Sequence, residues 1–424
     1  MYAMNVARIA EKIDAREHDI RKIIKYIDGY WPKLVREYKG DLRSLIGLPN
    51  PYIVPTDAGD IFQEQYYWDS YVVIRGLIHD SRYTKLCIGM VENFFYMLDR
   101  FGIIPNASRF YFLSRSQPPL LSSLVWLIYT KTKDKKWFKK GMQYVEYEYE
   151  HVWMGTTHLS NFRLTNIGLC RYYDINALDS LAEAESGWDM TMRFGGKCLD
   201  FVPVDLNCLL YLYEKDMEGA FRVLGDHERE KKYVSAADRR ARKINNYLWD
   251  DKVGFYFDYD FVNRRRSHLI TVAGAYPMNV GLASYERAAR SMEIIKDVLQ
   301  KKWGIVQGVR FVENLQWDWP NGWAPIQLRV VEGLIRYGYI SLAKRIIKKW
   351  LSLNIKVFRE TGFLWEKYDV VKGLVGVPDR YPTPYGFAWT NAIFLAFLEI
   401  FDYLEDHSYE NAMPTWMVRR LGWF

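Results

Sequence analysis

The sequence contains no apolar run long enough to cross a membrane. A spanning helix needs about 20 consecutive apolar residues, and the best stretch, from Leu120 to Tyr129, is interrupted by Ser122 and Ser123. The first 28 residues alternate charged residues with isoleucine, and they lack the basic start, apolar middle and small-residue cleavage site of a signal peptide. These absences count against a membrane or secreted protein and predict a cytoplasmic one.

Cysteine and histidine are scarce. The 424 residues include 4 Cys and 7 His, and neither residue type shows the short spacings of a metal site. Widely separated cysteines are typical of buried thiols in a reducing compartment. We therefore expect neither a metal ion nor another cofactor.

Positive charge exceeds negative charge by only a small amount. The 58 Lys and Arg residues against 51 Asp and Glu give a net charge of +7, and the basic residues lie in short runs scattered along the whole chain. A protein that binds nucleic acid more usually concentrates them into one surface stripe. The pattern indicates solvated helix faces, and no nucleic-acid partner is expected.

Apolar and aromatic residues are abundant, at 49% and 17% of the chain, which is enough for a large core. Isoleucines from Ile9 to Ile27 recur at helical spacing, and similar patterns continue to the C-terminal end. The predicted helices are 70–80, 83–101, 120–131, 137–153, 204–224, 228–248, 284–302, 326–337, 340–354 and 391–404. Only 254–259 and 308–311 indicate short strands. We expect an all-α fold in one domain over 1–424, with 1–50 as a helical extension packed on it.

The dipeptide Trp-Asp occurs four times, where about one occurrence is expected by chance. The four sites begin at Trp68, Trp188, Trp249 and Trp317. Each aspartate alone is explained by a helix N-cap, with the tryptophan fixing a loop to the core. Four such pairs in aromatic loops favour a sugar-binding cleft, because sugar rings stack on aromatic faces and sugar hydroxyls bind carboxylates.

Five segments, spread over most of the chain and in a fixed order, carry a family resemblance. They read Phe62-Gln-Glu-Gln-Tyr-Tyr-Trp-Asp-Ser-Tyr71; Ile104-Pro-Asn-Ala-Ser-Arg-Phe-Tyr-Phe-Leu-Ser-Arg-Ser-Gln-Pro-Pro119; Glu185-Ser-Gly-Trp-Asp189 with Pro203-Val-Asp-Leu-Asn207; Gln316-Trp-Asp-Trp-Pro-Asn-Gly-Trp-Ala-Pro325; and Glu366-Lys-Tyr-Asp369 with Gly386-Phe-Ala-Trp-Thr-Asn391. In these segments the chain resembles the trehalases of glycoside hydrolase family 37.

The resemblance implies an (α/α)6 barrel and an inverting hydrolysis of an α-glucosidic bond. By position in the motifs, Asp189 corresponds to the general acid and Glu366 to the general base. An inverting glycosidase needs such a pair, one carboxyl to protonate the leaving oxygen and one carboxylate to activate water. Lys367 and Tyr368 are near enough in sequence to help keep Glu366 ionised. Without the resemblance, Glu366 would be interpreted as a surface acid at the end of a helix.

The matching positions also imply sugar contacts. These are Phe62, Trp68, Asp69, Asn106, Arg115 and Trp317. Arg115 has two interpretations, since its guanidinium could bind adjacent hydroxyls or could form a buried ion pair that supports its loop. Gln316 and Asp318 are expected to belong to the loop scaffold.

The chain departs from the family pattern at three places. Residues 58–61 replace a Pro-Gly-Gly-Arg sequence, so that Ile61 occupies the position of an arginine. An Arg-Pro-Glu-Ser sequence is missing between Asp174 and Glu185, and Arg380 occupies the position of a lid glutamate. Loss of polar groups that bind hydroxyls changes which saccharide fits more than whether hydrolysis occurs. Arg380 would favour a substrate with a negative charge.

Hydrolysis of trehalose to glucose is therefore the predicted function, and a small neutral or anionic α-linked saccharide is the predicted partner. One alternative is an inverting α-glycosidase of the same fold that acts on another α-linked disaccharide or a glycosyl-glycerate. A non-catalytic sugar-binding relative is a second, although Asp189 and Glu366 are both present. A sugar epimerase would need paired histidines, and a helical scaffold would not explain the aromatic loops.

Overall fold

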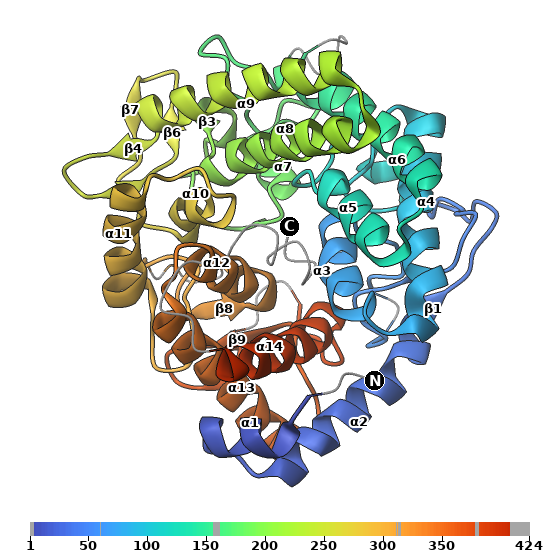
Figure 1. Cartoon of the computed structure of the whole chain (residues 1–424), viewed down its shortest axis with the longest axis vertical. Coiled ribbons are helices and arrows are strands. Elements are labelled where there is room, and N and C mark those ends of the chain that lie inside the picture. Colours follow the sequence, from blue (N-terminus) through green and yellow to red (C-terminus); the bar gives the residue numbers. More distant parts are fainter. Residues whose placement is uncertain are drawn as a thin grey trace.

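Helices make up most of the chain and lie in two concentric layers (Figure 1). The computed structural model describes residues 4–59, 61–155, 162–310, 312, 315–377 and 381–407. The inner helices are α3 (Tyr67–Leu77), α5 (Leu121–Thr132), α8 (Val204–Leu224), α10 (Tyr276–Asn279), α12 (Ala324–Arg336) and α14 (Ala388–Asp406). The outer helices are α2 (Glu17–Leu34), α4 (Thr84–Phe101), α6 (Lys135–Tyr147), α9 (His227–Tyr247), α11 (Tyr285–Ile294) and α13 (Ile340–Thr361).

The inner layer closes on itself. Each inner helix contacts the next in chain order, and α14 returns to contact α3. Most inner helices also pack against the outer helix that follows them, as in the pairs α5 with α6, α8 with α9 and α12 with α13. This arrangement confirms the predicted all-α class and the (α/α)6 barrel.

Local sequence explains most helix boundaries. The predicted helix 204–224 coincides with α8, which ends at Gly225 with a φ of 80°, a left-handed conformation that glycine adopts without strain. Helix α13 continues seven residues beyond the predicted end at Asn354. The buried Asn354 amide donates to the Trp350 carbonyl within the helix, so this residue does not interrupt it.

The N-terminal segment lies against the last two helices of the chain. Helix α1 (Val6–Ile13) contacts α2, α13 and α14, and α2 also contacts α13 and α14. One apolar cluster extends from Val6 to Leu404 and so includes this segment. The division into a 1–424 domain with an extension over 1–50 remains a prediction.

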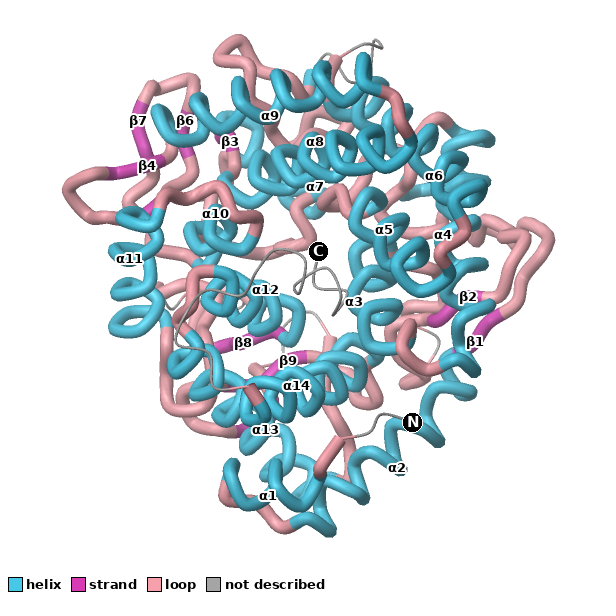
Figure 2. The backbone as a smooth tube through the Cα atoms, viewed as in Figure 1, coloured by secondary structure: helices cyan, strands magenta, loops and turns pink. Residues whose placement is uncertain are grey.

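Strands are short and lie in the segments that connect the helices (Figure 2). They form the antiparallel sheets β1 (Val35–Arg36) with β2 (Tyr52–Ile53); β3 (Phe201–Val202) with β6 (Tyr259–Asp260) and β7 (Arg265–Arg266); β4 (Trp249–Asp250) with β5 (Phe255–Tyr256); and β8 (Asn321–Trp323) with β9 (Lys367–Asp369) and β10 (Leu374–Val375). The strand predicted over 254–259 is present only in part, because β5 ends at Tyr256, β6 begins at Tyr259, and the two belong to different sheets. The one for 308–311 is wrong over its described residues, where Gly308 forms a single bridge with Thr271; Phe311 lies outside them.

Within the described ranges, no helix combines the length and the apolar character needed to cross a bilayer. The four cysteines are free and buried. No three His, Cys, Asp or Glu side chains of the described residues group as they would around a metal ion.

Candidate active site

A cavity of about 380 Å³ lies where α3, α12 and α14 begin, with Trp68, Trp323 and Trp389 among its walls. Its volume lies in the range of small-molecule sites, roughly 300–1,000 Å³. All eight side chains singled out from the sequence line it: Phe62, Trp68, Asp69, Asn106, Arg115, Asp189, Trp317 and Glu366. Segments that are hundreds of residues apart thus converge on one site, and the roles of these residues remain predictions.

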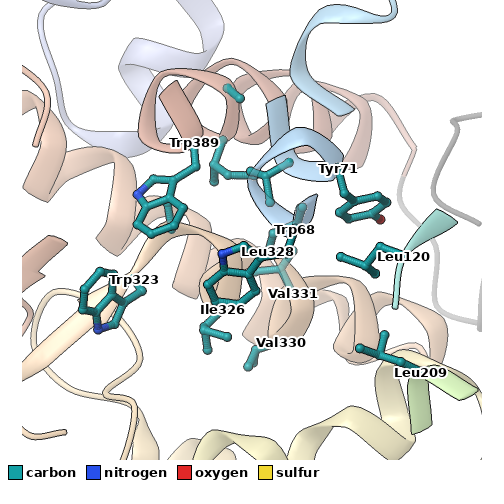
Figure 3. Packing of buried hydrophobic residues seen from close by; sticks show 14 of the residues in the cluster. Trp68, Tyr71, Leu120, Leu209, Trp323, Ile326, Leu328, Val330, Val331 and Trp389 are labelled. Atoms are coloured by element: carbon teal, nitrogen blue, oxygen red, sulfur yellow. The ribbon is translucent and has the colours of Figure 1, made fainter. Parts of the chain in front are cut away.

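Tryptophans form the apolar part of the cavity. The Trp317 ring stacks on Trp323, with centroids 3.7 Å apart, and lies parallel to Trp188 at 6.1 Å. Trp68 contacts Trp317 at 5.5 Å and meets Trp389 edge-on at 6.0 Å. Figure 3 shows Trp68, Trp323 and Trp389 packed above the aliphatic side chains of α12. These rings give a rigid wall of the kind on which sugar rings stack.

Asp189 projects from a loop between α7 (Asp179–Glu185) and α8, where it is half-buried. Trp317 Nε1 donates a hydrogen bond of 3.2 Å to its Oδ1 atom, and Gln316 Nε2 donates one of 3.3 Å to Oδ2. No helix starts at this residue, so the N-cap interpretation of Asp189 is wrong. Its loop position instead directs the carboxylate into the cavity.

The loop around Asp189 is fixed by the aspartate of another Trp-Asp pair. The Asp318 carboxylate accepts a hydrogen bond of 3.1 Å from the Thr191 hydroxyl and one of 2.7 Å from the Met192 backbone N–H. Gly187 has a φ of 75°, and a Cβ atom there would lie 3.1 Å from the Trp68 ring. Asp318 is thus part of the scaffold that positions Asp189.

A buried arginine, Arg193, lies in the same loop and fixes it to the neighbouring segments. Arg193 pairs with Asp205 through both terminal nitrogens, at 2.9 and 2.6 Å, and with Asp258 at 2.8 Å. Its guanidinium lies 4.3 Å from the centre of the Trp188 ring. All three charged side chains are buried, so the cation and its two anions stabilise one another.

Replacing Arg193 by Ala should lower the free energy of unfolding by about 3–5 kcal/mol, because two buried carboxylates lose their counterion. Urea unfolding followed by tryptophan fluorescence measures the change. The matched control is Arg21→Ala, which breaks an exposed ion pair with Glu17 and should cost less than about 1 kcal/mol. Equal losses for the two variants would contradict a structural role for the Asp205–Arg193–Asp258 cluster.

Glu366 is buried immediately before β9, with 2% of its surface exposed. Lys367 Nζ donates a hydrogen bond of 2.6 Å to Oε2, and the Tyr381 hydroxyl donates one of 2.9 Å to Oε1. The predicted proximity of Lys367 is confirmed. That of Tyr368 is wrong, since its hydroxyl instead accepts from the Trp365 N–H. Burial in the cavity wall excludes the interpretation of Glu366 as a surface acid.

A chain of hydrogen bonds joins the two carboxylates. The fully buried Lys367 ammonium donates both to Glu366 and, at 3.2 Å, to Gln316 Oε1. This bond fixes the orientation of the Gln316 amide, whose Nε2 donates to Asp189. The pairing of β8 with β9 places Lys367 opposite Trp323, 5.0 Å from its ring. Gln316 is therefore more than loop scaffold, because it connects Asp189 with Lys367.

Asp69 lies in the first turn of α3, so the N-cap interpretation is wrong here as well. The Gln117 side chain takes that place by accepting from the Trp68 N–H at 2.9 Å. The Asp69 carboxyl is thereby left to line the cavity. Burial, followed by the nearby charge of Glu366, raises its pKa to about 8. At neutral pH it is protonated and can both donate and accept a hydrogen bond.

The remaining predicted contacts form the cavity rim. Arg115 Nη1 pairs with Asp174 at 3.1 Å, so the ion pair anticipated as one interpretation is present, while the side chain also lines the cavity. Asn106 Nδ2 donates to two backbone carbonyls. The Phe62 ring meets Tyr381 edge-on at 5.6 Å.

Several cavity residues were missed in the sequence, most notably Glu183 and Tyr381. Tyr381 had a signal, since it directly follows the residue compared with the family's lid glutamate. Glu183 had only its closeness to Asp189. Ile61, at the position of the family's arginine, is 43% exposed and is not part of the lining. Arg380 lies outside the described residues, as does Asp60, so the structure does not address the predicted effect of Arg380.

Known proteins resemble the chain in both sequence and structure. A family model described as trehalase matches residues 4–181 and 178–402. The periplasmic trehalase of Citrobacter koseri is 33% identical over 421 residues, which cover 89% of this chain and 73% of that protein. The neutral trehalase Nth1 from Saccharomyces cerevisiae superposes with a TM-score of 0.73 at 28% identity, over 88% of this chain and 75% of that one.

A more distant structure shares the fold alone. It is the glycoside hydrolase family 63 mannosylglycerate hydrolase from Thermus thermophilus in complex with glucose, with a TM-score of 0.63 at 19% identity, over 89% of this chain and 100% of that one. The agreement of the family model with relatives of about one-third identity over most of the chain decides the classification. The chain belongs to the trehalase family of glycoside hydrolases.

Proposed function

We propose that the protein hydrolyses trehalose to two molecules of glucose with inversion at the bond cleaved. The observation that carries the proposal is the pair of carboxylates, Asp189 and Glu366, in one tryptophan-lined cavity and linked through Gln316 and Lys367. An inverting enzyme needs two carboxyl groups about 6.5–9.5 Å apart, so that a water molecule fits beside the sugar. Family membership supports the same substrate.

In the proposed reaction, Asp189 donates a proton to the glycosidic oxygen as the bond to the anomeric carbon breaks. Glu366 accepts a proton from a water molecule, which attacks the anomeric carbon from the opposite face. The Lys367 ammonium and the Tyr381 hydroxyl each donate a hydrogen bond to Glu366 and fix its orientation. Aspartate and glutamate thus exchange protonation states in one turnover.

The charges of the lining favour a neutral substrate over a glycosyl-glycerate. Four carboxyl groups face the cavity, from Asp69, Glu183, Asp189 and Glu366, and Arg115 is the one guanidinium among the described lining residues. The Arg115 charge is already paired with an aspartate. Among the described lining residues, a glycerate carboxylate would therefore find no cation without a partner, and burying it unpaired costs binding energy.

Proton NMR of the protein incubated with trehalose tests this function. Inversion turns the glucosyl unit attacked by water into β-glucose, while the leaving glucose keeps its α configuration. Equal initial amounts of the two anomers, before mutarotation, therefore support both the substrate and the inverting mechanism. A panel of other α-linked disaccharides and glycosyl-glycerates serves as the comparison. Release of α-glucose without β-glucose would contradict the assigned roles, and cleavage of another member of the panel alone would contradict the substrate.

Binding of trehalose should weaken as the pH rises through about 8, the pKa of Asp69. Because this pKa is raised, the carboxyl is protonated below that value and ionises above it, where it repels Glu366 and no longer donates to a hydroxyl. We expect KM to increase about tenfold between about pH 7 and about pH 9. Asp69→Asn, which stays neutral, should remove this increase. If KM of the variant still rises with pH as it does in the wild type, the role of Asp69 is contradicted.

The compartment remains a prediction of a cytoplasmic protein. The similar proteins are named periplasmic trehalases in one case and a neutral trehalase in the other.

A further inference from the structure

One wall of the cavity is formed by the short helix α7, which directly precedes the loop of Asp189. Its side chains at Ser180, Leu181, Glu183 and Ala184 line the cavity. Of these four, Glu183 alone carries a charge, and 9% of its surface is exposed. The proposed mechanism assigns no role to this carboxylate.

Its two carboxylate oxygens have different surroundings. The Oε1 atom accepts hydrogen bonds from the Met190 N–H at 2.8 Å and from the Thr191 N–H at 3.1 Å. Among the described residues, Oε2 has no hydrogen-bond partner, while the side chain lines the cavity. A carboxylate with one oxygen fixed by the loop and the other unpaired at a cavity wall is a ready acceptor for a ligand hydroxyl.

The charged groups around Glu183 are mainly of like sign. Burial is the main cause that raises its pKa to about 7, and the charges of Asp189 on the adjoining loop and Asp318 on the loop before β8 raise it further, against the two N–H donors. The buried thiol of Cys198, after the loop, also faces it. Because Oε1 is held by the two N–H donors, Oε2 of the ionised carboxylate is left to accept a hydrogen bond from a sugar hydroxyl.

Position along the loop indicates which half of the substrate meets Glu183. Met190, which donates to Oε1, directly follows Asp189, and Asp189 acts on the leaving oxygen in the proposed function, on which this inference rests. Glu366 directly precedes β9, and its partners Lys367 and Tyr381 lie on β9 and in the segment after it. We propose that Glu183 is a specificity-determining residue whose Oε2 atom binds a hydroxyl of the leaving sugar.

The test compares two substrates that differ in their leaving groups. In Glu183→Gln, the amide oxygen still accepts from Met190 and Thr191, but Oε2 becomes an NH2 group. For trehalose, kcat/KM should fall about 10- to 100-fold, as expected when a hydrogen bond to a charged or strongly polar group is lost. For α-glucosyl fluoride, which has no leaving sugar, it should stay within about twofold of the wild type.

Glu185→Gln is the matched control on the same helix. Both oxygens of Glu185 are occupied, Oε1 by the Ser116 N–H and Arg163 and Oε2 by the Tyr173 N–H, and the residue does not line the cavity. This variant should affect the two substrates alike. If Glu183→Gln also lowers kcat/KM equally for the two substrates, or leaves kcat/KM for trehalose unchanged, the proposal is overturned. A wild-type protein that cleaves the fluoride but not trehalose contradicts the proposed function instead, so the wild type is assayed first.

Discussion

Replacing Asp189 by Asn is expected to lower kcat/KM for trehalose by about 10²–10⁴-fold, the usual contribution of a general acid. The leaving group is a sugar hydroxyl, which departs as an alkoxide unless it is protonated. Asparagine keeps the size of the side chain and can still accept the bond from the Trp317 indole. Steady-state kinetics with trehalose, together with a thermal unfolding curve to verify the fold, measure the effect.

The same variant with α-glucosyl fluoride provides the control, because fluoride leaves with little need of a proton. Its kcat/KM should stay within about tenfold of the wild type. Equal losses on the two substrates would contradict the assignment of Asp189 as the acid. They would instead point to a structural disturbance, such as the NH2 group of asparagine facing Gln316 Nε2, whose amide cannot turn because Lys367 fixes it.

The barrel could be predicted because its signals are local. Helical periodicity along each segment, helix-ending glycines such as Gly225 and apolar faces of regular spacing are readable without knowing what lies nearby. The predicted start of the helix that became α3 was wrong because it depends on a contact with a residue distant in the sequence. Helix α3 begins at Tyr67, and the cap comes from Gln117, which lies 49 residues away from the N–H that it accepts.

The site was predictable where the type of residue indicates its chemical role. Motifs of known order indicated the eight lining residues, five of them carboxylates or tryptophans. Two of these, Asp189 and Trp317, are 128 residues apart and yet share a hydrogen bond. Supporting contacts were not predictable. Asp318 and Asp189 occur in the same dipeptide, but Asp318 fixes a loop while Asp189 faces the cavity. The dipeptide alone does not distinguish these two uses; the family resemblance did, by placing Asp318 in the loop scaffold and Asp189 in the site.

Glu183 illustrates the remaining gap. Its run, Ala182-Glu-Ala-Glu-Ser186, has two glutamates that look alike in sequence. In the structure Glu185 has both oxygens bonded within the protein, whereas one oxygen of Glu183, at the cavity wall, has no partner among the residues that the structure describes. The difference comes from which segments pack against α7, since Glu185 contacts three separate segments, whereas Glu183 contacts the loop that follows the helix.

Replacing Glu366 by Gln should lower kcat for trehalose by about 10²–10⁴-fold and should also destabilise the protein. The activity falls because the amide cannot accept a proton from water. The stability falls by about 3–5 kcal/mol, since the Lys367 ammonium, which is fully buried, loses its counterion. In this single variant, a loss of catalysis cannot be told apart from a loss of stability. Inactivity alone would therefore not identify Glu366 as the base.

The double variant Glu366→Gln/Lys367→Met separates them. Removing the ammonium leaves no unpaired charge, so urea unfolding should recover most of the lost stability, while turnover stays as low as in the single variant. The Tyr381 hydroxyl can still donate to the amide oxygen, which keeps that side of the cavity in place. Recovery of activity along with stability would show that Glu366 serves only to neutralise Lys367. Stability regained without activity is the result expected of a general base, because instability then no longer explains the lost turnover of the single variant.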